Sequence, residues 1–168
     1  MKKSKSKVLL SCIALIVFGA FIYMQSNTPY QDQDMKPLLK EYLHLSSESL
    51  PPISFRYDHE LVTTEQPYAF IEFSLRKLGH VLEYAGLTVL IYLLLSQFVL
   101  VSRWTFIFCL LFSLAYAITD EWHQRYTPGR TGHLIDVFTF DLIGILIALI
   151  IIGLTRKIRS IRTRTMNM

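Results

Sequence analysis

Two groups of polar residues at helical spacing carry the side chains that could do chemistry. Lys77, His80 and Tyr84 stand at i, i+3 and i+7, so they share one face of a helix, and Arg76 and Glu83 border the same face. An ammonium group beside an imidazole can hold an anion and transfer a proton. A basic pair at a helix start opposes the helix dipole, which suggests a role beyond helix stability. The alternative is that Arg76 and Lys77 anchor to lipid phosphates while Glu83 pairs with one of them.

The second group surrounds a short turn. Asp120 and Glu121 end an apolar stretch, a Pro-Gly turn leads to Arg130, and Asp136 and Asp141 follow at the start of the next apolar stretch. Arg130 is the natural counter-ion for Asp120 or Asp136, because its guanidinium fork fits a carboxylate or a phosphate. Asp136 and Asp141 would lie about 140° apart around an α-helix, so we do not expect a side-by-side dyad. A purely structural network of salt bridges is the alternative to a site.

Four uncharged apolar runs must position these groups. They cover residues 8–24, 84–102, 104–119 and 142–155, in a chain of 168 residues with 52% hydrophobic residues and a mean hydropathy of +0.36. About 20 residues of helix cross a bilayer core, and the last run reaches that length only by including the residues from about His133. The sequence predicts an all-α membrane protein with a bundle of four transmembrane helices. This composition excludes a disordered chain and a small disulfide-rich protein, and it disfavours a cytosolic enzyme.

The charges predict how the bundle is oriented. Four lysines precede the first run, Arg103 lies between the second and third, and residues 156–164 carry five more basic side chains. Four crossings place all of these on one side, which the positive-inside rule makes the cytoplasmic side of the membrane, with both termini there. All thirteen acidic residues lie in the outward segments or at the helix ends that border them. The net charge of +4 and the pI of about 9.1 therefore reflect topology, and we expect no nucleic-acid binding.

The chain divides into four parts. Residues 1–24 form a Lys-rich start and the first transmembrane helix. Its apolar run is longer than that of a signal peptide, and no signal-peptide cleavage site follows it. Residues 25–75 form an extracytoplasmic loop region with a short helix near residues 35–45 and a β-hairpin near residues 53–63. Residues 76–155 hold the second to fourth transmembrane helices, and residues 156–168 form a basic cytoplasmic tail.

The spacing of the polar residues resembles the VanZ-like family of bacterial membrane proteins. The resemblance rests on Asp120-Glu121-x-x-Gln124-x-x-x-Pro128-Gly129-Arg130 followed by Asp136, an acid at 141 and Gly144, and on Lys77-x-x-His80-x-x-x-Tyr84. It covers roughly residues 75–154, and residues 76–155 are taken as the VanZ-like domain. Position 141, often Asn in the family, is Asp here. The family is named for low-level resistance to the glycopeptide teicoplanin, so the resemblance implies a role in the cell envelope and in antibiotic resistance.

One hypothesis is an enzyme that acts on a lipid-linked phosphate or another anionic head group at the outer face of the membrane. Arg130 and Lys77 would hold the anion, His80 would be the general acid or base, and Asp120 or Glu121 would orient it. The candidate catalytic residues are His80, Asp120, Glu121 and Asp136. The candidate substrate-binding residues are Lys77, Tyr84, Gln124, Arg130 and Asp141.

A non-enzymatic protein that binds an envelope component or a glycopeptide is the second hypothesis, and a small transporter is a weaker third. We expect no metal and no cofactor, because no contiguous ligand motif such as HExxH is present. The expected partners are membrane lipids, together with an envelope precursor or a glycopeptide; the sequence does not decide the oligomeric state. The alternative to a metal-free site would use His80, Asp120, His123, His133 and Asp136 as ligands.

Overall fold

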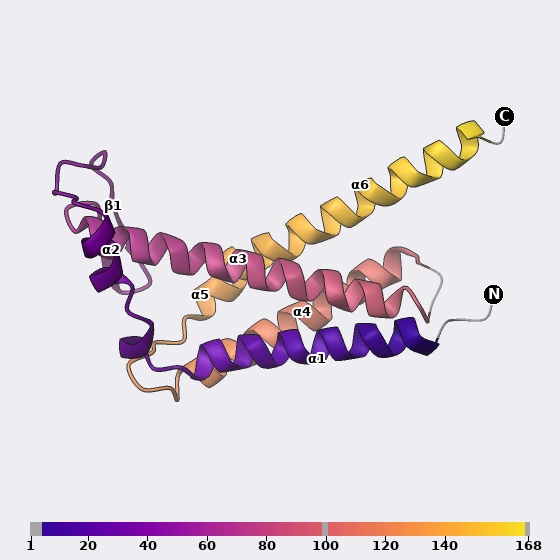
Figure 1. Cartoon of the computed structure of the whole chain (residues 1–168), viewed down its shortest axis with the longest axis horizontal. Helices are drawn as coiled ribbons and strands as arrows, with labels where there is room; N and C mark the ends of the chain where they lie inside the picture. Colours follow the sequence, from indigo (N-terminus) through magenta and orange to yellow (C-terminus); the bar gives the residue numbers. More distant parts are fainter. Residues whose placement is uncertain (1–4, 99–100, 167–168) are drawn as a thin grey trace.

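Four long helices form the bundle in a computed structural model that describes residues 5–98 and 101–166 (Figure 1). They are α1 (Lys5–Asn27), α3 (Pro67–Leu95), α4 (Arg103–Gln124) and a last helix that runs from Leu134 to Met166. All four are long and apolar enough to cross a membrane, so the protein is a multi-pass membrane protein of the predicted all-α class. Lys2 and Lys3 of the predicted basic start lie outside the described residues.

The last helix has three parts. It begins as α5 (Leu134–Asp136), continues through the π-helical segment η2 (Val137–Asp141), and ends as α6 (Leu142–Met166). The basic residues 156–164, predicted as a tail, belong to α6 and extend it as an exposed helix. Arg156 donates a hydrogen bond to the carbonyl of Val101.

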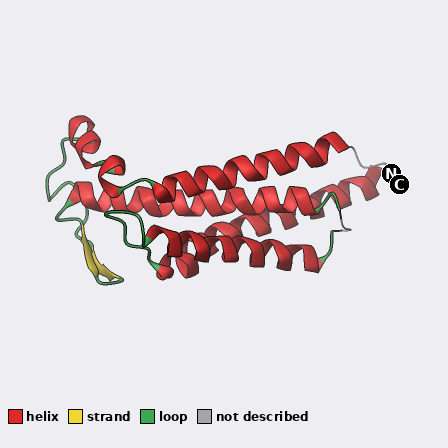
Figure 2. Cartoon of the chain, turned by 90° about the horizontal axis from the view of Figure 1, so that it is seen from below, coloured by secondary structure: helices red, strands yellow, loops and turns green. Residues whose placement is uncertain are grey.

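The connection between α1 and α3 lies at one end of the bundle, opposite the start of α1 and the end of α6 (Figures 1 and 2). It contains the 3-10 turn η1 (Tyr30–Gln33), the short helix α2 (Lys36–Tyr42), and the strands β1 (Ser54–Tyr57) and β2 (Glu60–Thr63). The strands pair antiparallel across a two-residue turn in which Asp58 has a positive φ of 56°. The short helix and hairpin agree with the predicted elements. We call this end of the bundle, with the α4–α5 loop, the loop end.

The start of α3 differs from the sequence boundary at residue 76. The helix begins at Pro67, because proline is favoured in the first turn of a helix and residues 68–75 continue the helical pattern. The apolar run that begins at residue 84 predicted only the membrane-spanning part of α3. The nine additional residues include Glu72 and Phe73, which contact the connection through Tyr30, Met35 and Tyr57.

Helix α3 is the centre of the bundle and packs against α1, α4 and α6. The buried core between these helices is small and includes Ile22, Tyr84, Ala117 and Ile145, whereas large apolar side chains on α1, α4 and α6 are exposed, as lipid-facing residues are. Polar contacts also join the helices: the hydroxyl oxygens of Thr88 and Ser113 lie 2.8 Å apart.

Two helices approach each other closely at Gly144. A Cβ atom at this position would overlap the carbonyl of Val81 on α3. Gly144 is one turn from Asp141, so the contact also fixes the position of Asp141, the last residue of η2, along the axis of α3. Glycine is required here by the approach of the two backbones.

Candidate functional site

A cavity of about 680 Å³ opens at the loop end. Its wall comes from the end of α1, the connection, the first half of α3 and the α4–α5 loop, so residues far apart in the sequence meet there. The charged side chains in the wall include cations and acids in similar numbers. They are Arg76, Lys77 and Arg130, and Glu60, Glu83 and Asp136, together with His80 and His133.

An ion pair joins α3 to the start of the last helix. The ammonium group of Lys77 lies 2.7 and 2.8 Å from the two carboxylate oxygens of Asp136, and both side chains are nearly buried. Tyr57, from the hairpin, donates a 2.5 Å hydrogen bond to the same carboxylate. The ammonium also stands 4.6 Å from the centre of the Tyr57 ring. Burial, followed by the bond to Asp136, raises the pKa of the Tyr57 phenol, so it remains a donor. The pair therefore fixes the hairpin over the cavity.

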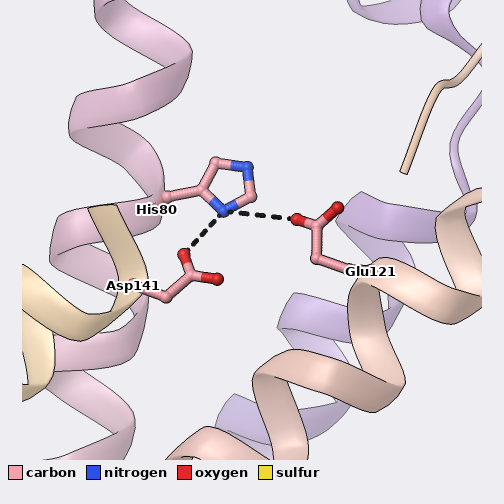
Figure 3. A group of neighbouring side chains, drawn as sticks. All are labelled: His80, Glu121 and Asp141. Atoms are coloured by element: carbon pink, nitrogen blue, oxygen red, sulfur yellow. Dashed lines mark hydrogen bonds and ion pairs between the residues drawn. The ribbon is translucent and has the colours of Figure 1, made fainter. Parts of the chain in front are cut away.

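A second cluster lies one turn further along α3. His80 Nδ1 is 2.9 Å from Asp141 Oδ1 and 3.9 Å from Glu121 Oε1, and Figure 3 shows both carboxylates pointing toward the imidazole. The carboxylates are buried, with 0% and 1% of the residue exposed for Asp141 and Glu121. Glu121 Oε2 accepts a 2.7 Å hydrogen bond from the backbone N–H of His133, which secures the end of the α4–α5 loop. His80 lines the cavity, whereas the two buried carboxylates do not.

The π-helical segment explains why Asp136 and Asp141 both face α3. The N–H of Leu142 reaches the carbonyl of Val137, five residues back. A π turn takes about 4.4 residues, so residues five apart are about 50° apart rather than 140°. The prediction of 140° was wrong because it assumed a regular α-helix. The two carboxylates form no dyad, because Asp136 binds Lys77 and Asp141 binds His80.

Asp120 takes part in a third, fully buried group of neutral partners. Its carboxylate accepts hydrogen bonds from Ser26 (2.6 Å), Tyr84 (3.1 Å) and Gln124 (3.0 Å). Gln124 also donates to the Ser26 hydroxyl at 3.2 Å. These contacts tie α1, α3 and α4 together. Asp120, Tyr84 and Gln124 thus lie beside the His80 cluster, and their hydrogen bonds join helices.

Arg130 does not pair with Asp120 or Asp136, which corrects the predicted counter-ion. Its guanidinium donates to the carbonyls of Gln25 and Thr28 at the end of α1, and to the side-chain oxygen of Gln33 at 2.5 Å. Asp136 is already held by Lys77, and Asp120 by uncharged donors. Within the described residues, Arg130 forms no ion pair with a carboxylate. The backbone carbonyls and the Gln33 amide oxygen hold it in the cavity wall without a carboxylate in direct contact.

Arg76 stands on the other side of Gln33. It donates a 3.1 Å hydrogen bond to the Gln33 carbonyl and lies 3.4 Å from Glu72, while its buried Nε has no hydrogen-bond partner in the described residues. Burial, followed by the nearby charge of Arg76, lowers the pKa of Arg130. Two guanidinium groups therefore converge on one neutral glutamine, as they would on an anion.

Glu83 and the hairpin contacts were not among the predicted site residues. Glu83 lines the cavity and makes no hydrogen bond or ion pair with the described residues, so the pairing with Arg76 or Lys77 considered above does not occur. Its i+3 spacing from His80 was the only signal for it. His133 Nδ1 lies 2.5 Å from Asp58 at the hairpin turn, and this contact lowers the pKa of Asp58. No sequence signal predicts these partners, which are 75 residues apart.

The five residues considered as metal ligands do not come together. Asp120 and Asp136 are held as described, His133 meets Asp58, and His123 stacks on Tyr23 and lies near Asn27. In the described residues, the group of potential ligands that does converge is His80, Glu121 and Asp141, whose ligand atoms lie within 4.8 Å of one another.

A family model described as VanZ/LLP1 matches residues 9–156, which is most of the chain. The chain matches no curated protein and no solved structure. The matched region includes α1 from residue 9, the connection, α3, α4 and the last helix as far as residue 156, and therefore every residue of the cavity wall named above.

Proposed function

Since the chain belongs to the VanZ/LLP1 family, a membership that links it in general to glycopeptide resistance, we propose that its cavity binds an anionic head group of an amphiphilic envelope molecule. The ligand class is a phosphate-bearing lipid or a lipid-linked precursor. Binding takes place at the loop end, beside the lipid, and the molecule's apolar tail stays in the bilayer.

The observation that carries this proposal is the guanidinium of Arg130 in the cavity wall, whose direct partners among the described residues are neutral oxygens. A phosphate oxygen that replaces the Gln33 amide oxygen would accept a charge-assisted hydrogen bond from Arg130 and reach Arg76 beside it. Such bonds are about twice as strong as those between neutral groups. The arrangement accepts one anion without breaking the Lys77–Asp136 pair.

The depth of the cavity supports a ligand with an apolar tail. His80 lies 15 residues before the end of α3, about 22 Å along the helix, which is less than the ~30 Å hydrocarbon core. The cavity floor is therefore within the membrane, whereas Arg76 and Arg130 are nearer its surface. A head group would enter from the side of the lipid head groups.

The loop end faces outward in this proposal, because the basic residues of α6 and Arg103 occupy the opposite end. In a variant without the native cysteines, Glu48→Cys should react with an impermeant thiol reagent on intact bacteria. Arg162→Cys should react only after the membrane is opened. The reverse pattern would invert the orientation.

A comparison of bacterial strains tests the function. A strain without the protein is complemented with wild type, Arg130→Ala or Arg56→Ala, and envelope lipids, lipid-linked precursors and teicoplanin susceptibility are measured. Arg56 is exposed on the hairpin outside the cavity, so its variant removes the same charge from the same end. We expect wild type and Arg56→Ala to shift the same lipid and the same susceptibility, and Arg130→Ala to match the empty strain at equal membrane abundance. Full activity of Arg130→Ala would exclude the proposed anion site.

Glu83 favours a second candidate, a non-enzymatic protein that binds a glycopeptide. Its carboxylate, unpaired among the described residues, could hold a cationic amine while Arg130 holds a carboxylate of the same ligand. The variant His80→Gln separates this candidate from an enzyme. If the protein is an enzyme, this variant should abolish turnover of its lipid substrate. If it only binds a ligand, the variant should keep the wild-type affinity for that ligand and the wild-type effect on teicoplanin susceptibility.

A further inference from the structure

We propose that His80, Glu121 and Asp141 form a binding site for one divalent transition-metal ion such as Zn²⁺ or Mn²⁺. The residues come from three separate helical segments, α3, α4 and η2, and their ligand atoms converge within 4.8 Å (Figure 3). The proposal rests on this cluster alone and does not require the head-group site.

Unpartnered oxygens in the cluster point to a cation. Glu121 Oε1 and Asp141 Oδ2 are buried and accept no hydrogen bond from the described residues. Both residues are at least nine-tenths buried, and Figure 3 shows their carboxylates directed toward the imidazole of His80. Buried polar atoms are normally satisfied, so two bare carboxylate oxygens around one histidine indicate a ligand.

The charge of the cluster supports the same conclusion. Two carboxylates with a neutral imidazole carry −2, and even a protonated His80 leaves −1 in a buried place. Lys77 does not compensate this charge, because both of its short contacts are with Asp136. A divalent ion neutralises the two carboxylates, whereas burial of an unpaired charge is costly.

The distances fit an ion after a small adjustment. Nitrogen and oxygen ligands bound at about 2.0–2.2 Å stand about 3.0–3.5 Å from one another in tetrahedral and octahedral sites. The imidazole nitrogen lies 2.9 Å from Asp141 and 3.9 Å from Glu121, and all three ligand atoms lie within 4.8 Å of one another, so the glutamate oxygen must move toward the other two to bind the same ion. One nitrogen and two carboxylate oxygens suit Zn²⁺ or Mn²⁺ better than the all-oxygen sites of Ca²⁺.

The cluster also has the form of an open metal site. Three protein ligands leave positions for water or for an oxygen of a bound molecule. His80 lines the cavity, which gives the ion a path from the loop end. Glu121 is oriented by the backbone N–H of His133, an outer hydrogen bond of the kind that fixes metal-binding carboxylates.

The test is metal binding by the purified, tag-free full chain in detergent after chelator treatment. Zn²⁺ and Mn²⁺ are titrated separately, the metal content after gel filtration is measured, and Tm is followed. Wild type should bind one ion per chain, and Tm should rise by about 5 °C or more at a hundredfold excess over Kd.

The variants Glu121→Gln and Asp141→Asn keep the shape of the side chains and remove one charge each. They should bind the ion at least tenfold more weakly while remaining folded, and Glu65→Gln, at an exposed carboxylate outside the cavity, should bind like wild type. Absence of binding to wild type with both ions would overturn the proposal. Equal affinity in the Gln and Asn variants would assign any bound metal to other residues and would overturn it as well.

Discussion

Replacing Lys77 by Met is expected to lower the free energy of unfolding by about 3–5 kcal/mol, because it leaves the Asp136 carboxylate buried with the Tyr57 hydroxyl as its one side-chain partner among the described residues. Asp136→Asn should have a similar effect, since it leaves the ammonium of Lys77 buried without its counter-ion. The effect is measured from chemical unfolding in detergent micelles. It is large because both partners are withdrawn from water and held in one geometry by the hairpin.

The double variant Lys77→Met/Asp136→Asn separates lost pairing from lost packing. It removes both charges and retains an acceptor for the Tyr57 hydroxyl, so most of the lost stability should return. Lys157→Met, on the exposed part of α6, should change stability by less than about 0.5 kcal/mol. If the two single changes simply add in the double variant, the ion pair is not the source of the effect.

Replacing Gly144 by Leu is expected to remove both stability and function. The first atom of any side chain would overlap the carbonyl of Val81, so α6 must move away from α3. Overpacking commonly costs about 1–3 kcal/mol, and a clash between two backbones should reach or exceed the upper value. The shift also separates Asp141, which lies about one turn before Gly144, from His80, which directly precedes Val81. Chemical unfolding and the lipid comparison above measure the two consequences.

Gly153→Ala is the matched control on the same helix. A Cβ atom there would meet the Phe106 ring at 4.0 Å, an ordinary contact, and alanine favours the helix. We expect unchanged or slightly higher stability and normal function. A stable, functional Gly144→Leu variant would contradict the close packing of α3 and α6.

The sequence predicts the bundle well because the lipid core imposes a simple rule. Each crossing needs a long uncharged run, and four such runs correspond to α1, α3, α4 and the last helix. Hydropathy does not predict where the helices begin and end: α3 begins at Pro67, nine residues before the predicted boundary. Helical propensity, rather than hydropathy, decides that position.

The grouping of the site residues could be only partly predicted. Helical spacing placed Lys77, His80 and Tyr84 together, but their partners depend on helices packed from elsewhere in the chain. The π turn before Leu142 rotates Asp141 toward His80, and no residue pattern signals it. Arg130 is held by backbone carbonyls, which the identities of side chains do not reveal.

The central claim is that Arg130 holds the phosphate of a lipid head group, and direct binding tests it. Wild type, Arg130→Ala, Arg130→Lys and Arg56→Ala are purified in nanodiscs, and Kd is measured for a short-chain lipid phosphate and for a neutral lipid with the same tails. Wild type and Arg56→Ala should prefer the phosphate, Arg130→Lys should retain part of that preference, and Arg130→Ala should bind it about 10- to 100-fold more weakly, as expected for a lost charge-assisted hydrogen bond. Equal affinity of wild type and Arg130→Ala for the lipid phosphate would contradict the account.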